Sequence, residues 1–242
     1  RPTPCLTQRR VLFHIVNFSK SKSLYREGMS PLVRSARHPA WHRVPPRNVF
    51  YYRCPSHRKN YVLSFLFEFA PEAKVGTTVG DDTYYFAYSF PYTYTELQKY
   101  LYALEMCELP HVRRELLGRT LQHRRIDLLT ITDDAAVGAT DADPAAEQAS
   151  SKATKAKSKC ESKNKKWVVL MARVHPGETP AQYIMQGMLE FLTGDSAEAR
   201  ALRRRVVFKV IPMLNPDGVV LGNYRCGLAG VDLNRNWLEP SK

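Results

Sequence analysis

Hydrophobic and polar residues alternate in several short runs within residues 11–90. The runs are VLFHIVNF (11–18), NVFYYRC (48–54), YVLSFLFEFA (61–70) and TYYFAYSF (83–90). A period of two sends successive side chains to opposite faces of a β-strand. We therefore predict an antiparallel, β-sandwich-like domain over residues 1–92. On the same grounds, the aromatic residues of 84–94 are assigned to packing of the sheet rather than to a base-stacking surface.

From Thr95 onward the hydrophobic period lengthens to about 3.6 residues, which predicts a helix with Thr95 as its N-cap. The apolar stripe of this helix is formed by Leu97, Tyr100, Leu101, Leu104 and Cys107. Strand-like runs follow at 126–132, 167–172 and 205–214, and a helix opens at Pro180. Such alternation predicts, over residues 93–242, an incomplete α/β domain with a mostly parallel or mixed sheet and flanking helices.

Residues 133–166 differ from the sequence around them. Their first half is acidic, their second half is rich in lysine, and they contain no aromatic residue. Such a segment cannot bury enough apolar surface to offset the entropy of ordering it. We predict a disordered insertion between two strands, and a lysine patch that recruits an acidic partner is the alternative interpretation.

The sequence is basic, and its basic residues are concentrated at one end. It has 36 Lys and Arg against 23 Asp and Glu, and 13 of the basic residues but only one acidic residue lie in residues 1–60. A concentrated positive field attracts anionic partners, for which nucleic acid, phosphoinositide surfaces and acidic polypeptide tails are candidates. A solvated basic face without a partner is the alternative.

Neither a membrane span nor a disulfide framework is indicated. No window of about 18 consecutive apolar residues occurs, and the first residues lack the profile of a signal peptide. The five cysteines are widely spaced and form no CxxC pair. We therefore expect a cytosolic, reducing setting and no cysteine-based zinc site.

The segment WVVLMARVHPGETPAQYIMQGMLEFL (167–192) carries His175 and Glu178 on a turn between a strand and a helix. Side chains placed in this way can point at one place, and zinc accepts imidazole nitrogen and carboxylate oxygen as ligands. An HxxE pair is weak evidence by itself, because a glutamate at a helix start is also favoured by the helix dipole. Helix capping is therefore the alternative to metal binding.

The segment RVVFKVIPMLNPDGVVLGNYRCGLAGVDLNRNWLEP (205–240) places Arg225, Asn234 and Arg235 on turn-rich chain after a strand. Its NPDG run (215–218) predicts a turn in which the glycine tolerates a positive φ. A guanidinium grips a carboxylate with two parallel hydrogen bonds, and a neighbouring amide completes a cradle for a terminal carboxylate. Arginines on surface loops are the alternative.

Together and in this order, four motifs resemble those of the carboxypeptidase A-like zinc peptidases. They are HPGE (175–178), NPDG (215–218), NYR (223–225) and DLNRNW (232–237). The resemblance implies that residues 93–242 are the N-terminal part of a zinc carboxypeptidase domain. It also implies a Zn²⁺ cofactor held by His175 and Glu178, oxyanion stabilisation by Arg225, and binding of the substrate's terminal carboxylate by Asn234 and Arg235.

Three longer stretches, 16–32, 84–97 and 210–237, resemble the cytosolic carboxypeptidases within that family. The resemblance implies a cytosolic metalloprotease that removes C-terminal amino acids, glutamates above all, from acidic protein tails. Tubulin is then the candidate partner, protein deglutamylation the expected activity and microtubules a candidate location. Nucleic acid is not expected as a partner.

The family's site has parts that the printed sequence lacks. Catalytic zinc requires three protein ligands and one open position for water. The family's third ligand is a histidine that follows DLNRNW, with a catalytic glutamate much later, whereas His175 is the last of seven histidines here. We interpret Asp232 as orienting Arg235 rather than as a substitute ligand. We expect both ends of the sequence to be cut inside a longer polypeptide, and the 242 residues alone to bind zinc poorly and hydrolyse nothing detectable.

Two other interpretations stay open. One is an aspartoacylase-like acyl-amino-acid hydrolase, whose zinc site also resembles an HxxE plus a DxNR motif. The Trp after Asn236, the NPDG turn and the upstream β-domain favour the peptidase. The other is an inactive, truncated fragment that acts only as a basic binding module for acidic tails or nucleic acid. The salt dependence of binding would separate the two partners, because phosphate contacts give a steep slope.

Overall fold

The structure is a computed structural model that describes residues 9–56, 60–69, 82–133 and 165–239. The chain divides into two compact units, Arg1–Pro91 and Tyr92–Lys242. Each unit is built around its own hydrophobic core. None of the described helices has the length and apolar character needed to cross a bilayer.

The described residues of the first unit form two three-stranded sheets in which all paired strands are antiparallel. One sheet has the order β1-β5-β4, with β1 Arg9–Phe18, β5 Tyr61–Phe69 and β4 Val49–Arg53. The other has the order β3-β2-β6, with β3 His42–Arg43, β2 Leu32–Ser35 and β6 Tyr84–Ala87. A single 3₁₀ turn, η1 (Pro46–Asn48), leads into β4. The predicted antiparallel, sandwich-like region is confirmed.

Aromatic rings fill the space between the two sheets. Phe65 stacks on Phe13 with ring centres 4.9 Å apart, and it lies 5.5 Å from Phe86 of the other sheet. Tyr84 also packs against this core, whereas Tyr85 between them is 51% exposed. Within β6 the assignment to core packing therefore holds for Tyr84 and Phe86 but not for Tyr85, because neighbours on a strand face opposite ways. Beyond the strand, Phe90 is 42% exposed.

The second unit is an α/β domain, as predicted. Its elements are α1 (Tyr94–Met106), β7 (Val112–Arg119), β8 (Arg125–Ile131), β9 (Lys166–Met171), α3 (Pro180–Thr193), α4 (Ala197–Arg205), β10 (Val206–Ile211), α5 (Pro216–Leu221) and η3 (Leu233–Arg235). The sheet has the order β7-β8-β10-β9, and only β9 and β10 are parallel. The sheet is therefore mixed rather than mostly parallel, because β7 and β8 form a hairpin and β8 runs against β10.

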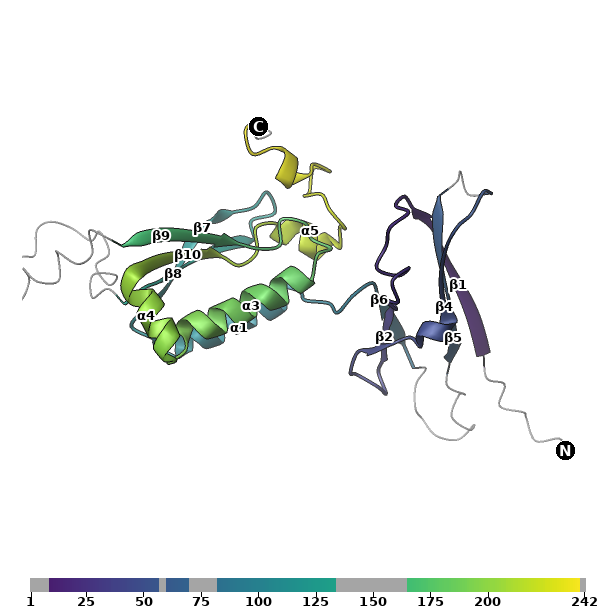
Figure 1. The fold of residues 1–242 in the computed structure, drawn as a ribbon, viewed down its shortest axis with the longest axis horizontal. Helices are drawn as coiled ribbons and strands as arrows, with labels where there is room; N and C mark the ends of the chain where they lie inside the picture. The colour runs from purple at the N-terminus through teal and green to yellow at the C-terminus, as the bar shows by residue number, and fades with distance from the viewer. Residues whose placement is uncertain (1–8, 57–59, 70–81, 134–164, 240–242) are drawn as a thin grey trace, which may run out of the picture. The chain divides into compact units, whose positions relative to one another are not determined.

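The helices α1 and α3 cover one face of this sheet (Figure 1). Leu97 and Leu101 of α1 and Leu189 of α3 join the core formed by Leu129 and Val210 of the strands. The helix α1 begins earlier than predicted, with Thr93 as its N-cap instead of Thr95. Glu96 stands three residues after Thr93, and the two residues complete a capping box.

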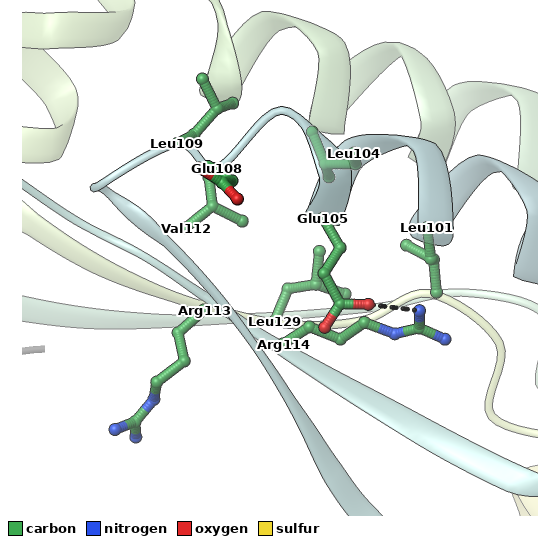
Figure 2. A pocket seen from close by; sticks show the side chains of 9 residues that line it. All are labelled: Leu101, Leu104, Glu105, Glu108, Leu109, Val112, Arg113, Arg114 and Leu129. Carbon is green, nitrogen blue, oxygen red and sulfur yellow. Dashed lines mark hydrogen bonds and ion pairs between the residues drawn. The ribbon is translucent and has the colours of Figure 1, made fainter. Parts of the chain in front are cut away.

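A pocket of about 230 Å³ lies between α1 and β7 (Figure 2). At its edge Arg114 pairs through Nη1 with Glu105 at 3.2 Å and through Nε with the buried Asp127 at 3.0 Å. These contacts fasten the helix to the β7–β8 hairpin. The pocket shares no residue with the motifs above, so we assign it no part in their chemistry. The predicted insertion lies almost wholly in residues 134–164, outside the described residues, between β8 and β9.

Candidate active site

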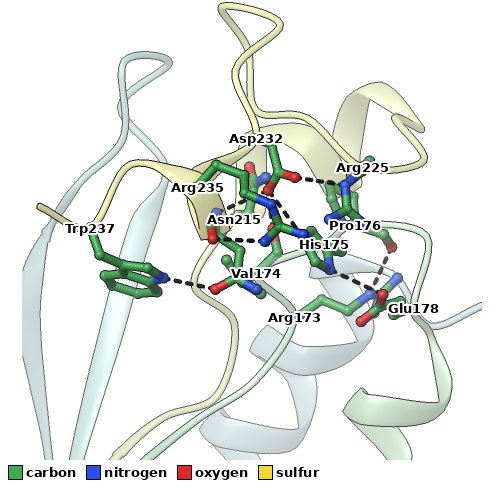
Figure 3. A network of polar contacts seen from close by, with 11 residues as sticks. Arg173, Val174, His175, Pro176, Glu178, Asn215, Arg225, Asp232, Arg235 and Trp237 are labelled. Carbon is green, nitrogen blue, oxygen red and sulfur yellow. Dashed lines mark hydrogen bonds and ion pairs between the residues drawn. The ribbon is translucent and has the colours of Figure 1, made fainter. Parts of the chain in front are cut away.

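The HPGE and NPDG motifs meet because each follows one of two neighbouring parallel strands. β9 ends at Met171 and β10 ends at Ile211, and the two residues are paired in register. Parallel strands end at the same edge of a sheet, where ligand sites of open α/β sheets are found. His175 and Glu178 lie on the loop after β9, with Nδ1 of the histidine 3.0 Å from Oε1 of the glutamate (Figure 3). The His175 side chain is 8% exposed and that of Glu178 is 58% exposed.

The NPDG motif supports this loop from the neighbouring strand end. It is the start of α5 and not a free turn: Oδ1 of Asn215 accepts from the Gly218 amide at 3.0 Å, and its Nδ2 donates to the Val174 carbonyl at 3.2 Å. The φ of Gly218 is not positive, contrary to our expectation. Glycine is required there for close packing, since a Cβ would lie 2.4 Å from Cγ of Pro176.

Arg173 supports the loop that carries the HPGE motif. Its side chain is buried, its Nε donates to the Pro176 carbonyl at 2.8 Å, and its Nη1 donates to the Tyr92 carbonyl at 3.1 Å. Burial lowers the pKa of this guanidinium to about 10, so it remains charged at neutral pH. Its φ of 57° lies in the left-handed region, which is uncommon for a residue with a Cβ.

Asp232 connects the HPGE motif to the NYR motif. Its Oδ1 lies 3.1 Å from Nε2 of His175, and its Oδ2 accepts from Nε of Arg225 at 2.6 Å. Our interpretation that Asp232 orients Arg235 is wrong, because the Asp232 carboxylate contacts the side chains of His175 and Arg225 instead (Figure 3). Burial alone would raise the pKa of the Asp232 carboxyl. The hydrogen bonds that it accepts, first from Arg225 and then from the Asn234 amide, outweigh burial and lower the pKa.

Asn234 and Arg235 lie on the exposed 3₁₀ turn η3, which Asp232 caps. Nε1 of Trp237 donates to Oδ1 of Asn234 at 2.7 Å. This bond fixes the amide so that its NH₂ group is left to donate elsewhere. Nη1 of Arg235 donates to the Asn234 carbonyl at 3.0 Å, so donors from two neighbouring residues lie on one turn.

A family model for zinc carboxypeptidases matches residues 97–241. The chain belongs to the zinc carboxypeptidase family. Cytosolic carboxypeptidase 6 of Mus musculus is 49% identical to it over 233 residues, which are 96% of this chain and 38% of that protein. Cytosolic carboxypeptidase 6 of Homo sapiens is 49% identical over 235 residues, which are 96% of this chain and 40% of that protein. The resemblance to the cytosolic carboxypeptidases is thereby confirmed, and this zinc carboxypeptidase chain spans about two fifths of the length of these relatives.

A solved structure supports the same family assignment. The metallo-carboxypeptidase of Burkholderia cenocepacia superposes on this zinc carboxypeptidase chain with a TM-score of 0.64 and 28% sequence identity. The match covers 96% of this chain and 50% of that protein. The fold of the chain therefore resembles that of a solved metallo-carboxypeptidase.

The family implies zinc, and the polar atoms around His175 fit a cation. The Asp232 carboxylate can only accept a hydrogen bond when it is ionised, so Nε2 of His175 carries a proton. In a neutral imidazole the lone pair of Nδ1 then faces the Glu178 carboxylate at 3.0 Å. Two acceptors at that distance require a cation or a proton between them. Among the described residues no group of three His, Cys, Asp or Glu side chains gathers as a metal site.

The sequence motifs pointed to some of these residues and not to others. His175, Glu178 and Arg225 are brought together through Asp232, whereas Asn234 and Arg235 lie on the adjoining turn. The contact of Asp232 with His175 was missed, although a metal-binding histidine commonly donates its second nitrogen to a carboxylate. Arg173 had no signal in the sequence, because its role depends on the path of the backbone around it.

Proposed function

We propose that the protein is a zinc metallocarboxypeptidase that removes C-terminal residues from acidic protein tails. The observation that carries the proposal is the double contact of Asp232. One carboxylate holds Nε2 of His175 at 3.1 Å and Nε of Arg225 at 2.6 Å. A metal-ligand candidate and a cation for the substrate's carbonyl oxygen are thus fixed relative to each other, as a reaction on that carbonyl requires.

His175 and Glu178 are the residues that would hold the zinc ion, which when bound supplies a Lewis acid and an activated water. Arg225 would stabilise the negative charge that develops on the carbonyl oxygen. Because its Nε is held by Asp232, its two Nη groups remain to face the substrate. A fixed cation at a developing oxyanion is worth about 3–4 kcal/mol in a site that excludes water.

Asn234 and Arg235 would bind the terminal carboxylate of the substrate. An amide NH₂ and a guanidinium on one turn match the two oxygens of a carboxylate. This contact would place the last peptide bond, and no internal one, beside Arg225. The restriction to chain ends would follow from that placement.

Acidic tails are proposed as substrates on the grounds of charge and family resemblance. Residues 1–60 carry 13 basic residues and one acidic residue, and such a field raises the local concentration of anionic chains. The relatives named cytosolic carboxypeptidases support a cytosolic setting. We propose glutamate-rich tails, with those of tubulin as the candidate, and hence protein deglutamylation near microtubules.

The test uses the whole protein and a peptide that ends in several glutamates, with released glutamate as the measured product. We expect Arg225→Ala to lower kcat about 10²- to 10³-fold while KM changes far less. Arg200→Ala, which removes an exposed arginine from α4, is the control and should leave both values unchanged. An unchanged kcat in Arg225→Ala would remove Arg225 from the mechanism, and release of acid from an acyl-amino acid instead would favour the aspartoacylase-like alternative.

The 242 residues by themselves provide a second test. They offer two candidate ligands, so we expect weak zinc binding and no detectable hydrolysis from them alone. Isothermal calorimetry with Zn²⁺ measures this directly. Stoichiometric binding with a submicromolar dissociation constant would contradict the assignment of only two ligands to this part of the chain.

A further inference from the structure

A row of three side chains crosses the sheet β3-β2-β6 of the first unit. Arg34 on the middle strand β2 is paired with Tyr85 on β6. On the other side Trp41 directly precedes β3, whose His42 pairs with Val33. The guanidinium carbon of Arg34 lies 4.9 Å from the ring centre of Trp41 and 5.2 Å from that of Tyr85. The arginine is therefore held between two aromatic rings.

A second arginine lies on the same face of this sheet. Arg43 on β3 is paired with Leu32, which stands two residues before Arg34 on β2 and therefore faces the same way. Its guanidinium carbon lies 5.4 Å from the ring centre of Phe90, and its Nη1 donates to the Ser30 carbonyl at 2.9 Å. Both arginines are exposed.

Neither Arg34 nor Arg43 has an acidic partner in the part of the chain that the structure describes. Arginines of the second unit differ in this respect, since Arg114 and Arg124 each pair with a buried aspartate. A guanidinium that is stacked on aromatic rings loses little side-chain entropy on binding, and the edge that carries its N–H groups stays open. Two such groups, neither of them paired with an acid among the described residues, form a surface suited to carboxylates, although Asp82 lies nearby, where it accepts from the Arg37 amide.

The spacing of the two arginines selects the kind of partner. They are diagonal neighbours on adjacent antiparallel strands, for which separations of about 7–8 Å are typical. In an extended peptide, side chains two residues apart lie roughly 6.6 Å from each other on one side. We infer that this face binds an extended acidic peptide, with carboxylates at alternate positions engaging Arg34 and Arg43.

An acidic peptide fits this face better than a nucleic acid. The rings of Trp41 and Tyr85 each have a face covered by the Arg34 guanidinium, so stacking of bases between them is blocked. What remains accessible is the planar fork of the arginine, which matches a carboxylate. The surface shares no residue with the proposed carboxylate cradle at Asn234 and Arg235, and only the choice of glutamate as the acidic residue rests on the proposed function.

The test is fluorescence anisotropy with a labelled peptide of six glutamates whose C-terminus is amidated, at about 50 mM salt because charge contacts are screened at higher ionic strength. Amidation removes the terminal carboxylate of the peptide, so binding reports on this face and not on the carboxylate cradle at Asn234 and Arg235. We expect the double variant Arg34→Gln, Arg43→Gln to raise Kd at least about tenfold. Arg53→Gln, which removes one charge from a strand of the other sheet, is the control and should change Kd less than about twofold.

A further variant distinguishes the effect of the stacked Arg34 from that of the overall positive charge of the unit. Tyr85→Leu leaves the net charge intact and frees one side of Arg34, and we expect Kd to rise about three- to fivefold. Three outcomes would overturn the inference. They are an unchanged Kd in the double variant, an equal loss in Arg53→Gln, and single-stranded RNA that binds with the same dependence on Arg34. Glutamate release by the whole protein, measured separately, tests the proposed activity whether or not this face binds.

Discussion

His175 and Asp232 are 57 residues apart in the sequence, and Nε2 of the histidine lies 3.1 Å from Oδ1 of the carboxylate. This contact sets which nitrogen of the ring is free. With Nε2 facing an acceptor, Nδ1 points to Glu178, 3.0 Å away. If His175 holds a metal ion, the Asp232 carboxylate would act on it through the histidine, as outer partners of metal sites commonly do.

Replacing this carboxylate should weaken the metal site. In the whole protein we expect Asp232→Ala to lower the affinity for Zn²⁺ about 10- to 100-fold, because the His175 ring loses its fixed tautomer and orientation. Competition with a chromophoric chelator measures the change. Asp195→Ala, which removes an exposed carboxylate before α4, is the control. Equal affinity in both variants would show that Asp232 serves Arg225 alone.

Arg173 should be needed for the stability of the loop after β9, which carries His175 and Glu178. Arg173→Met removes the donors to the Pro176 and Tyr92 carbonyls and leaves two buried acceptors without partners. We expect the free energy of unfolding to fall by about 2–4 kcal/mol. Urea denaturation measures this loss, and faster hydrogen exchange in residues 174–178 would locate it.

The matched variant for Arg173 is Arg200→Met, which loses an exposed arginine and should change stability by less than about 0.5 kcal/mol. Arg173→Lys retains the charge and can keep one of the two bonds, so an intermediate loss is expected. If Arg173→Met unfolds at the same urea concentration as the unaltered chain, the loop does not depend on this side chain.

Long periodic segments of the fold were predictable from the sequence, and short or charged ones were not. The helix α3 and the strands β9 and β10 follow from their apolar runs and, for α3, from the proline at its start. The strands β2 and β3 have four and two residues, too few to display a period. The helix α4 was missed because its sequence AEARALRRR is mostly charged and buries only Ala199 and Arg203.

The site divides in the same way. His175, Glu178 and Arg225 were recognisable because their motifs are continuous in the sequence. The contacts that hold them join loops from different strand ends, and spacing along the chain does not encode such contacts. Asp232 was therefore assigned to Arg235, three positions away, instead of to His175, which only the folding of the sheet brings near.

Asp217 should make stability depend on pH. Burial would raise the pKa of this carboxyl, but hydrogen bonds from Arg124, from Thr120 and from the Gln122 amide outweigh burial and lower the pKa. A carboxyl with a lowered pKa stabilises the fold above its unfolded pKa, and this contribution is lost as the pH falls through the folded value.

Below about pH 4 we therefore expect the stability of the unaltered chain to fall more steeply than that of Asp217→Asn. At pH 7 the variant should be less stable by about 1–3 kcal/mol, because the ion pair of Asp217 with Arg124 at 2.7 Å is lost. Urea denaturation from pH 7 to pH 3 measures both effects. If stability changes with pH in the same way in the unaltered chain and in Asp217→Asn, the assignment is wrong. Asp195→Asn, which removes an exposed carboxylate, is the control, and its stability should follow that of the unaltered chain at every pH.

Two glycines should respond in opposite directions to the same substitution. At Gly218 a Cβ would lie 2.4 Å from Cγ of Pro176 and 2.9 Å from the Cys226 carbonyl oxygen, so Gly218→Ala must displace the HPGE loop or the chain after α5. We expect a loss of about 1–3 kcal/mol in the free energy of unfolding, together with weaker zinc binding in the whole protein.

At Gly187, in the middle of α3, a Cβ would meet nothing within 4 Å. Gly187→Ala should stabilise the chain by about 0.5–1 kcal/mol through helix propensity. Thermal and urea unfolding of the two variants side by side would test the close packing of NPDG on HPGE, and a stabilised Gly218→Ala would contradict it.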